Sequence, residues 1–286
     1  MRRLFLACGF LVALTASAVR AAETKRPAGE TKRSAGAIKQ PAGETKRPVG
    51  LSAAQIAERN VAARGGLKAW QAVRALQMSG EMDAGGKSDA KLPFALFLKR
   101  PHKSRLELTF AGKNAVQVYD GTQGWKLRPF LNRDDVEPFN PNELQAAAST
   151  AELDGPLVDY AAKGTRIELA GTEKVEGKKA YKLKLTLKNG EQRFLWVDAG
   201  TFLDTKISGD PRKLDGRPHQ VAIYSRDYRT VDGLKIPFVQ EAVVDGVKQS
   251  HKIVIKAVVV NPPLRDALFA KPTVAMARAP GAAHAP

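Results

Sequence analysis

Alternating apolar and polar positions dominate the second half of the chain and predict a β-sheet. Leu106, Leu108 and Phe110 alternate with polar residues, and residues 181–188 read Tyr-Lys-Leu-Lys-Leu-Thr-Leu-Lys. A period of two gives each strand one buried and one wet face. Turn signals separate the runs: Asp120-Gly121, Asn189-Gly190, Asp215-Gly216, Asp232-Gly233 and Asp245-Gly246. Because such pairs favour tight hairpins, the sequence predicts a large antiparallel, meandering sheet.

The pattern turns helical at the front of this region. Ser52 and Gln55 have the spacing of a capping box, apolar residues then recur at helical spacing, and Gly65-Gly66 supplies a stop. A second short helix is expected over 67–73, and it carries Trp70.

Helical spacing returns in the middle of the chain. Asn142 is expected to cap a helix over 143–150, and Gly155-Pro156 to open another over 157–163. These helices must bury their apolar stripes, and the concave face of a strongly curved sheet is the natural place. The expected fold class is therefore α+β.

The N-terminus has the pattern of a secretory signal peptide over residues 1–21. Arg2 and Arg3 precede an apolar stretch, and Val19-Arg20-Ala21 fits the small-x-small rule for cleavage. The apolar run is too short for a permanent membrane anchor. Cys8, the single cysteine, would leave with the signal. We therefore expect an exported protein without a disulfide or a thiol.

Residues 22–50 are expected to form a flexible basic linker. The heptapeptide Glu23-Thr-Lys-Arg-Pro-Ala-Gly29 is the first of four copies, of varying fidelity, that end at Gly50. Glycine and proline in the repeat argue against a coiled coil. The formal net charge of the whole chain is +17, which favours anionic partners. Since the chain is exported, a transient membrane-surface contact is expected and nucleic acid is not. The folded domain is expected over 51–271, with an Ala/Pro-rich disordered tail over 272–286.

Constellations that carry catalysis are missing from the sequence. The four histidines form no zinc-binding motif, and there is neither a nucleophile elbow nor a phosphate-binding loop. We expect no metal, no cofactor and no enzymatic activity.

Two segments resemble the LolA-type outer-membrane lipoprotein carriers and, more broadly, the LolA/LolB/RseB superfamily. The first is Phe97-Leu-Lys-Arg-Pro101 followed by Arg105-Leu-Glu-Leu108. The second is Val116-Gln-Val-Tyr-Asp-Gly121 followed by Gly124-Trp125. The match covers about residues 92–127, and later elements agree only in their order. The chain is longer than the carriers, and His102 stands where they often have an aromatic residue.

The resemblance implies an incomplete antiparallel β-barrel, a curved half-barrel sheet with helices covering its open side. In such carriers the arginine of the Lys-Arg-Pro motif ties the helical lid to the barrel, and here it is Arg100. The alternative reading is that Arg100 and its proline simply end a strand. Leu106, Leu108 and Phe110 share one strand face and are the expected cavity wall, with Trp125 nearby; they would equally serve as filled core.

The function that follows is a monomeric periplasmic carrier. It would bury an apolar ligand, namely lipoprotein acyl chains or lipid, in the half-barrel cavity and take part in sorting lipoproteins to the outer membrane. Each buried methylene contributes about 0.8 kcal/mol, so one acyl chain supplies most of the affinity. The alternative is an RseB-like periplasmic regulator that binds a lipid or peptide signal and a membrane partner.

Overall fold

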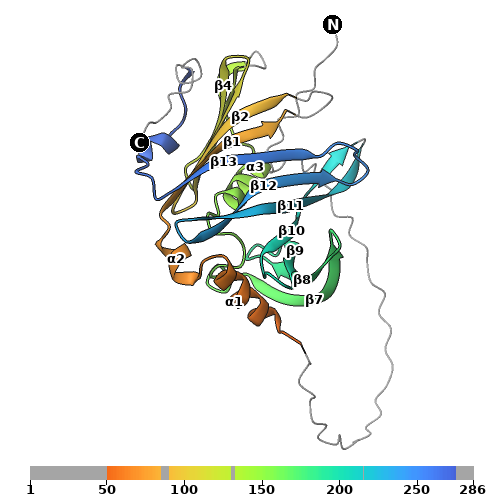
Figure 1. Cartoon of the computed structure of the whole chain (residues 1–286). Coiled ribbons are helices and arrows are strands. Elements are labelled where there is room, and N and C mark those ends of the chain that lie inside the picture. The colour runs from red at the N-terminus through yellow and green to blue at the C-terminus, as the bar shows by residue number, and fades with distance from the viewer. Residues whose placement is uncertain (1–49, 85–89, 130–132, 215, 275–286) are drawn as a thin grey trace, which may run out of the picture.

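One continuous antiparallel sheet of 13 strands forms the frame of the computed structural model (Figure 1). The structure describes residues 50–84, 90–129, 133–214 and 216–274. The expected signal peptide, the linker as far as residue 49 and the tail from residue 275 lie outside these residues. Among the described residues, no helix has the length and apolar character needed to cross a membrane.

The elements follow the order that the sequence pattern predicts, with helices first and in the middle. The strands are β1 (Ala75–Asp83), β2 (Lys91–Lys99), β3 (Lys103–Phe110), β4 (Lys113–Tyr119), β5 (Gly124–Arg128), β6 (Arg133–Pro138), β7 (Arg166–Val175), β8 (Lys178–Thr186), β9 (Gln192–Asp198), β10 (Asp204–Leu214), β11 (Arg217–Val231), β12 (Leu234–Val244) and β13 (His251–Val260). The helices are α1 (Ala53–Ala63), α2 (Leu67–Ala72), α3 (Pro141–Thr150) and the short 3₁₀ helix η2 (Asp266–Phe269).

The sheet is an open half-barrel whose two edges come from the middle of the chain. Its strand order is β6-β5-β4-β3-β2-β1-β13-β12-β11-β10-β9-β8-β7. Strands that are neighbours in the chain pair with each other, except for β6 and β7, and β1 also pairs with β13, so the first and last strands meet inside the sheet. The sheet curls around α3, while α1 and α2 lie at one end of it (Figure 1). The predicted α+β half-barrel is therefore confirmed.

Local signals in the sequence account for the front helices and the hairpins. Ser52 Oγ accepts a hydrogen bond from the Gln55 amide at 3.2 Å, and the Gln55 side chain accepts one from the Ser52 amide at 2.9 Å. The predicted capping box is therefore present, and Gly65 follows the helix with a φ of 116°, which suits glycine. Four of the five predicted turn pairs each lie between two consecutive strands of the sheet, and Asp215 of the fifth lies outside the described residues.

Two predictions for the middle of the chain are wrong. The third helix is capped by Asn140 instead of Asn142: Asn140 Oδ1 accepts from the Glu143 amide at 2.9 Å, and Pro141 takes the first helical position, where its missing N–H costs nothing. Residues 157–163 form successive turns instead of a helix. Asp159 has a φ of 50°, and a left-handed residue interrupts a right-handed helix.

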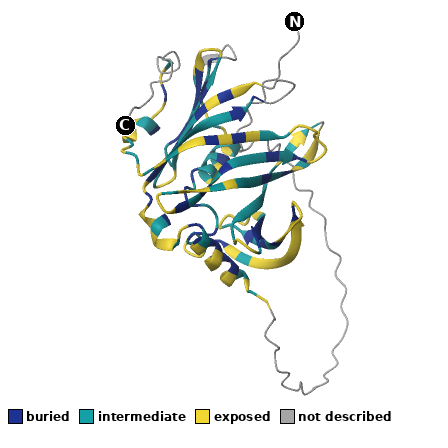
Figure 2. Ribbon diagram, viewed as in Figure 1, coloured by how far each residue is buried: buried dark blue, intermediate teal, exposed yellow. Residues whose placement is uncertain are grey.

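The main core lies on the concave face of the sheet, and a smaller cluster lies on the opposite face. Ile56, Val61 and Trp70 bring the front helices into the main core. On the opposite face, Phe269 of η2 covers a cluster from β2, β4 and β5, whose members are Phe97, Val116, Val118 and Leu127. β2 and β4 therefore contribute buried residues to both clusters, and Figure 2 shows buried segments along the strands of the sheet.

Candidate functional site

An apolar cavity with a volume of 320 Å³ lies between the concave face and the segment that follows α3. Its wall comes from seven strands of both halves of the sheet: Leu76, Met78, Phe94, Leu96, Leu98, Leu195, Ile207, Ile223, Ile236, Ile253 and Ile255. Residues 151–165, which connect α3 to β7, are called the lid below. Leu153, Gly155 and Pro156 of the lid line the cavity together with Trp70 of α2.

Strand register explains why the wall is apolar. Leu98 pairs with Leu76, and Leu96 pairs with Met78, so the alternate residues of β2 and β1 point to the same face. The wall is therefore a direct product of the period-two pattern.

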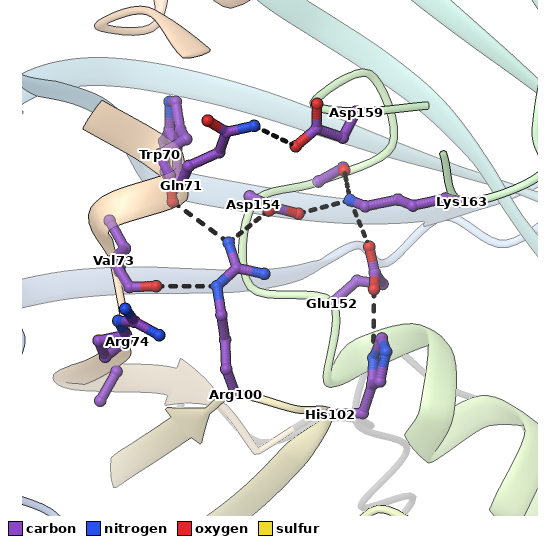
Figure 3. Close-up of polar contacts among 12 residues, drawn as sticks. Trp70, Gln71, Val73, Arg74, Arg100, His102, Glu152, Asp154, Asp159 and Lys163 are labelled. Carbon is purple, nitrogen blue, oxygen red and sulfur yellow. Dashed lines mark hydrogen bonds and ion pairs between the residues drawn. The ribbon is translucent and has the colours of Figure 1, made fainter. Parts of the chain in front are cut away.

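Arg100 ties the lid to the end of β2 and to α2 (Figure 3). Its Nε donates to the Val73 carbonyl at 2.8 Å, and its Nη2 lies 3.2 Å from the Trp70 carbonyl and 2.6 Å from Asp154 Oδ2. The Asp154 side chain is only 4% exposed, whereas that of Arg100 is 34% exposed. One guanidinium therefore joins a strand, a helix and the lid.

A second set of ion pairs reinforces this latch from within the lid. Lys163 Nζ lies 2.5 Å from Asp154 Oδ1 and 2.5 Å from Glu152 Oε2 (Figure 3). Glu152 in turn lies 3.2 Å from His102 Nδ1, beyond the end of β2. Burial alone would raise the pKa of Asp154, but Lys163 and Arg100 outweigh burial and hold that pKa below its usual value.

The cavity has a polar side where α1 ends. Arg64, Asp204 and Tyr228 line it there. Arg64 Nη1 donates to the backbone carbonyl of Asp154 at 2.9 Å and lies 4.0 Å from Asp204 Oδ2. The guanidinium stacks over the Trp70 ring at 4.6 Å from its centroid. Arg64 therefore contacts the same lid residue as Arg100, from the cavity side.

The Asp204 carboxylate accepts a hydrogen bond from a neutral donor, the side-chain amide of Asn60. The Asn60 amide donates to Asp204 Oδ1 at 2.8 Å and also to the Phe202 carbonyl at 2.7 Å. Burial raises the pKa of Asp204 above its usual value, although the charge of Arg64 and the Asn60 hydrogen bond oppose the rise. Tyr228 donates to the Asp204 carbonyl at 3.0 Å, and burial together with Asp204 raises the pKa of its phenol.

The structure distributes the five predicted site residues over three places. Arg100 is at the lid latch. Leu106 and Leu108 are buried in the concave core and pair with Leu96 and Phe94 of the cavity wall, so they lie one strand outside the cavity lining. Phe110 is partly buried beside the same core. Their role in ligand binding remains a prediction.

Trp125 lies away from the other four, on the opposite face of the sheet. It packs in the cluster that η2 covers and pairs with Val118, which pairs with Arg105. Arg105 and Leu106 are consecutive residues of a strand, so they point to opposite faces. The expectation that Trp125 stands near Leu106 and Leu108 at the cavity is therefore corrected.

Sequence analysis did not select Arg64, Asn60, Asp204 or Tyr228. Asn60 and Asp204 are 144 positions apart in the chain, and no local motif connects them. The one local signal was Asn60 itself, a polar residue on the apolar stripe of α1 that is fully buried. Among the described residues, no group of three or more His, Cys, Asp or Glu side chains is placed to hold a metal ion.

Comparison with known proteins finds likeness in structure. No family model and no curated protein matches the sequence. A DUF1329 family protein from Desulfovibrio piger aligns with a TM-score of 0.53 at 16% identity, over 75% of this chain and 95% of that one. A domain assigned to outer membrane lipoprotein sorting, from Vibrio parahaemolyticus, aligns with a TM-score of 0.51 at 13% identity, over 76% of this chain and 95% of that one.

A third solved structure, a LolA superfamily protein from Nitrosomonas europaea, aligns over 78% of this chain and 99% of that one, at 14% identity and a TM-score of 0.49. At the identities of the first two matches, the likeness concerns the fold. The resemblance read from the sequence is therefore upheld at the level of the fold, which this chain shares with the DUF1329 family protein and with the domain assigned to lipoprotein sorting.

Proposed function

We propose that this protein is an exported, non-enzymatic carrier that buries an apolar ligand between the half-barrel and its lid. The observation that carries the proposal is the 320 Å³ cavity, whose wall is apolar and whose lid is held by a latch of ion pairs. The fold it shares with a domain assigned to lipoprotein sorting supports the same class of ligand, an acyl chain of a lipid or lipoprotein.

The size of the cavity favours one acyl chain at a time. Ligand sites of small molecules span roughly 300–1,000 Å³, and this cavity lies at the lower limit. Each methylene that enters contributes about 0.8 kcal/mol. A larger cargo requires the lid to move, which the latch between Arg100 and Asp154 opposes.

The site of action that we propose is the periplasm. A cleaved signal peptide over residues 1–21 leaves a basic mature chain, whose linker tethers a monomeric carrier close to anionic membrane surfaces. Mass spectrometry of the mature N-terminus tests this step, since cleavage after Ala21 is the expected result.

Mass spectrometry of organic extracts tests the carrier. Protein purified from its native host should release a stoichiometric lipid or lipoprotein, and the lipid-free protein should rebind one acyl chain. Leu96→Trp fills the cavity and should reduce rebinding about tenfold, whereas Val259→Trp, at a position that is 48% exposed, should leave it unchanged. An apo-protein that instead retains one membrane protein in pull-downs would favour the regulator of the RseB kind.

A further inference from the structure

The guanidinium of Arg64 is incompletely paired at the wall of an apolar cavity. Arg64 is 7% exposed, and its Nε is buried without a hydrogen-bond partner among the residues that the structure describes. Its side chain makes one hydrogen bond to the described residues, from Nη1 to the Asp154 carbonyl at 2.9 Å. A buried donor without an acceptor destabilises the protein, and more so when the donor is charged. A ligand that brings an acceptor would remove that cost.

The nearest carboxylate compensates this charge poorly. Asp204 Oδ2 stands 4.0 Å from Arg64 Nη1, too far for a hydrogen bond, and Asp204 Oδ1 is occupied by the Asn60 amide. Burial also raises the pKa of Asp204, which disfavours its charged form. A buried cation requires a close counter-charge, and the described residues do not supply one in contact with Arg64.

The surroundings of Arg64 fit an anionic group with an apolar tail. One face of its guanidinium lies over the Trp70 ring, and the lid approaches it at Gly155, where an added Cβ would come within 3.0 Å of Nη1. Glycine at position 155 therefore leaves room for the guanidinium. The apolar wall formed by Leu76, Met78 and their neighbours belongs to the same cavity.

We propose that Arg64 is a head-group site, so that the cavity selects single-chain lipids with an anionic oxygen head, a carboxylate or a phosphate, over neutral lipids. The inference rests on the proposed carrier function and names its substrate class. Arg64 binds the head-group oxygens with its planar donor fork, and the chain extends along the apolar wall.

Binding of matched lipids to the lipid-free mature protein tests the head-group site. The probes are hexadecanoic acid, its methyl ester and a hexadecanoyl lysophosphatidic acid, and the readout is isothermal titration. We expect the acid to bind at least tenfold more tightly than the ester, which corresponds to 1.4 kcal/mol. The lysophosphatidic acid, compared with the acid, identifies which head group fits best, and tighter binding of either anion than of the ester supports the proposal.

Variants of two arginines at α1 provide the matched comparison. Arg64→Met should lower the affinity for the acid to that for the ester and leave the ester unchanged. Arg59→Met removes the same charge from an exposed position over the Phe202 ring and should preserve the tenfold preference. Asp204→Asn should tighten the acid alone, because it removes the competing carboxylate.

Each result decides between the two proposals. Equal affinity of the wild-type protein for acid and ester overturns the head-group site and leaves the carrier intact. Binding of neither probe overturns the carrier itself. If Arg64→Met fails to fold, the wild-type acid-to-ester ratio and Asp204→Asn still decide: no preference for the acid, or no tightening of it by Asp204→Asn, contradicts the head-group site.

Discussion

Two arginine–aspartate pairs meet at one residue of the lid and differ in almost every respect. Arg100 Nη2 contacts the Asp154 carboxylate at 2.6 Å. Arg64 instead donates to the Asp154 backbone carbonyl, and its Nη1 lies 4.0 Å from the carboxylate of its partner, Asp204. The pKa of Asp154 is lowered and that of Asp204 is raised. A satisfied ion pair therefore holds an element in place, whereas an unsatisfied one leaves hydrogen-bond donors that can bind a ligand.

Breaking the Arg100 pair should have the largest effect. Asp154→Asn removes the carboxylate that Arg100 and Lys163 share but keeps the carbonyl that Arg64 uses. We expect the free energy of unfolding to fall by about 3 kcal/mol, as when a buried ion pair loses one partner. Urea denaturation measures it. Asp159→Asn, which alters an acidic residue of the same lid that accepts from Gln71, should cost less than about 0.5 kcal/mol; equal losses would refute the special role of Asp154.

Removing the other partner should cost less and affect the lid more. Arg100→Leu should lower the free energy of unfolding by about 2 kcal/mol, because Arg100 is one-third exposed and water replaces part of its hydrogen bonds. It should also raise retention of apolar ligand during purification, since a weaker latch lowers the cost of opening the lid. Arg74→Leu, at an exposed neighbour, is the control for charge. Unchanged retention with reduced stability would identify Arg100 as purely structural.

The Asp204 pair should respond with the opposite sign. Asp204→Asn removes a carboxylate whose pKa burial raises in the folded protein, so the free energy of unfolding at pH 7 should rise. Thermal unfolding at fixed protein concentration measures the change. A loss comparable with that of Asp154→Asn would mean that Asp204 and Arg64 form a fully effective ion pair, which contradicts the comparison.

The smallest expected effect is a difference in how Asp154 and Asp204 change the pH dependence of stability. A lowered folded-state pKa means that Asp154 contributes stability above its unfolded value of 3.8 and loses it as the pH falls through the folded value. A raised folded-state pKa means that the cost of Asp204 is absent at low pH and grows as the pH rises above 3.8.

Variants reveal both slopes. The deficit of Asp154→Asn relative to the wild-type protein should shrink as the pH falls below about 4, and the gain of Asp204→Asn should grow from about 4 upward. Denaturation midpoints measured across this range check the signs. Parallel curves for the two variants would refute the opposite shifts.

Sequence patterns predicted what depends on neighbours along the chain. The capping box at Ser52, the alternation of Leu183 and Leu185 with Lys182 and Lys184, and the hairpin turns are all present. The Lys-Arg-Pro motif directed attention to Arg100, which hydrogen-bonds to α2 and to Asp154 of the lid. A sequence motif sufficed there because Arg100 bonds to carbonyls close to where β2 ends, at Val73 and Trp70.

The errors at Trp125, Arg64 and Asp204 arose where segments distant in the chain determine the structure, whereas the error at the α3 cap is local. The expected position of Trp125 is wrong because η2, at Asp266–Phe269, covers the outer face of β4 and β5. The cap of α3 was misplaced because two asparagines compete, and Pro141 with Glu143 favours the first. Arg64 and Asp204 were missed because their meeting depends on the curl of the whole sheet, which no period in the sequence encodes.

The strand order shows that the lid is part of the segment that connects the two edges of the sheet. β6 and β7 are the two free edges of the sheet. Residues 139–165 therefore connect one edge of the half-barrel to the other. No strand pairing joins β6 to β7 in the described sheet. Cleavage within residues 139–165 would therefore leave all twelve strand pairings intact but would free the two edges to separate. A circular permutant that joins residue 271 to residue 50 and has its new termini within 155–164 would therefore lack this connection. The length of one loop would then no longer limit how far the two edges can separate.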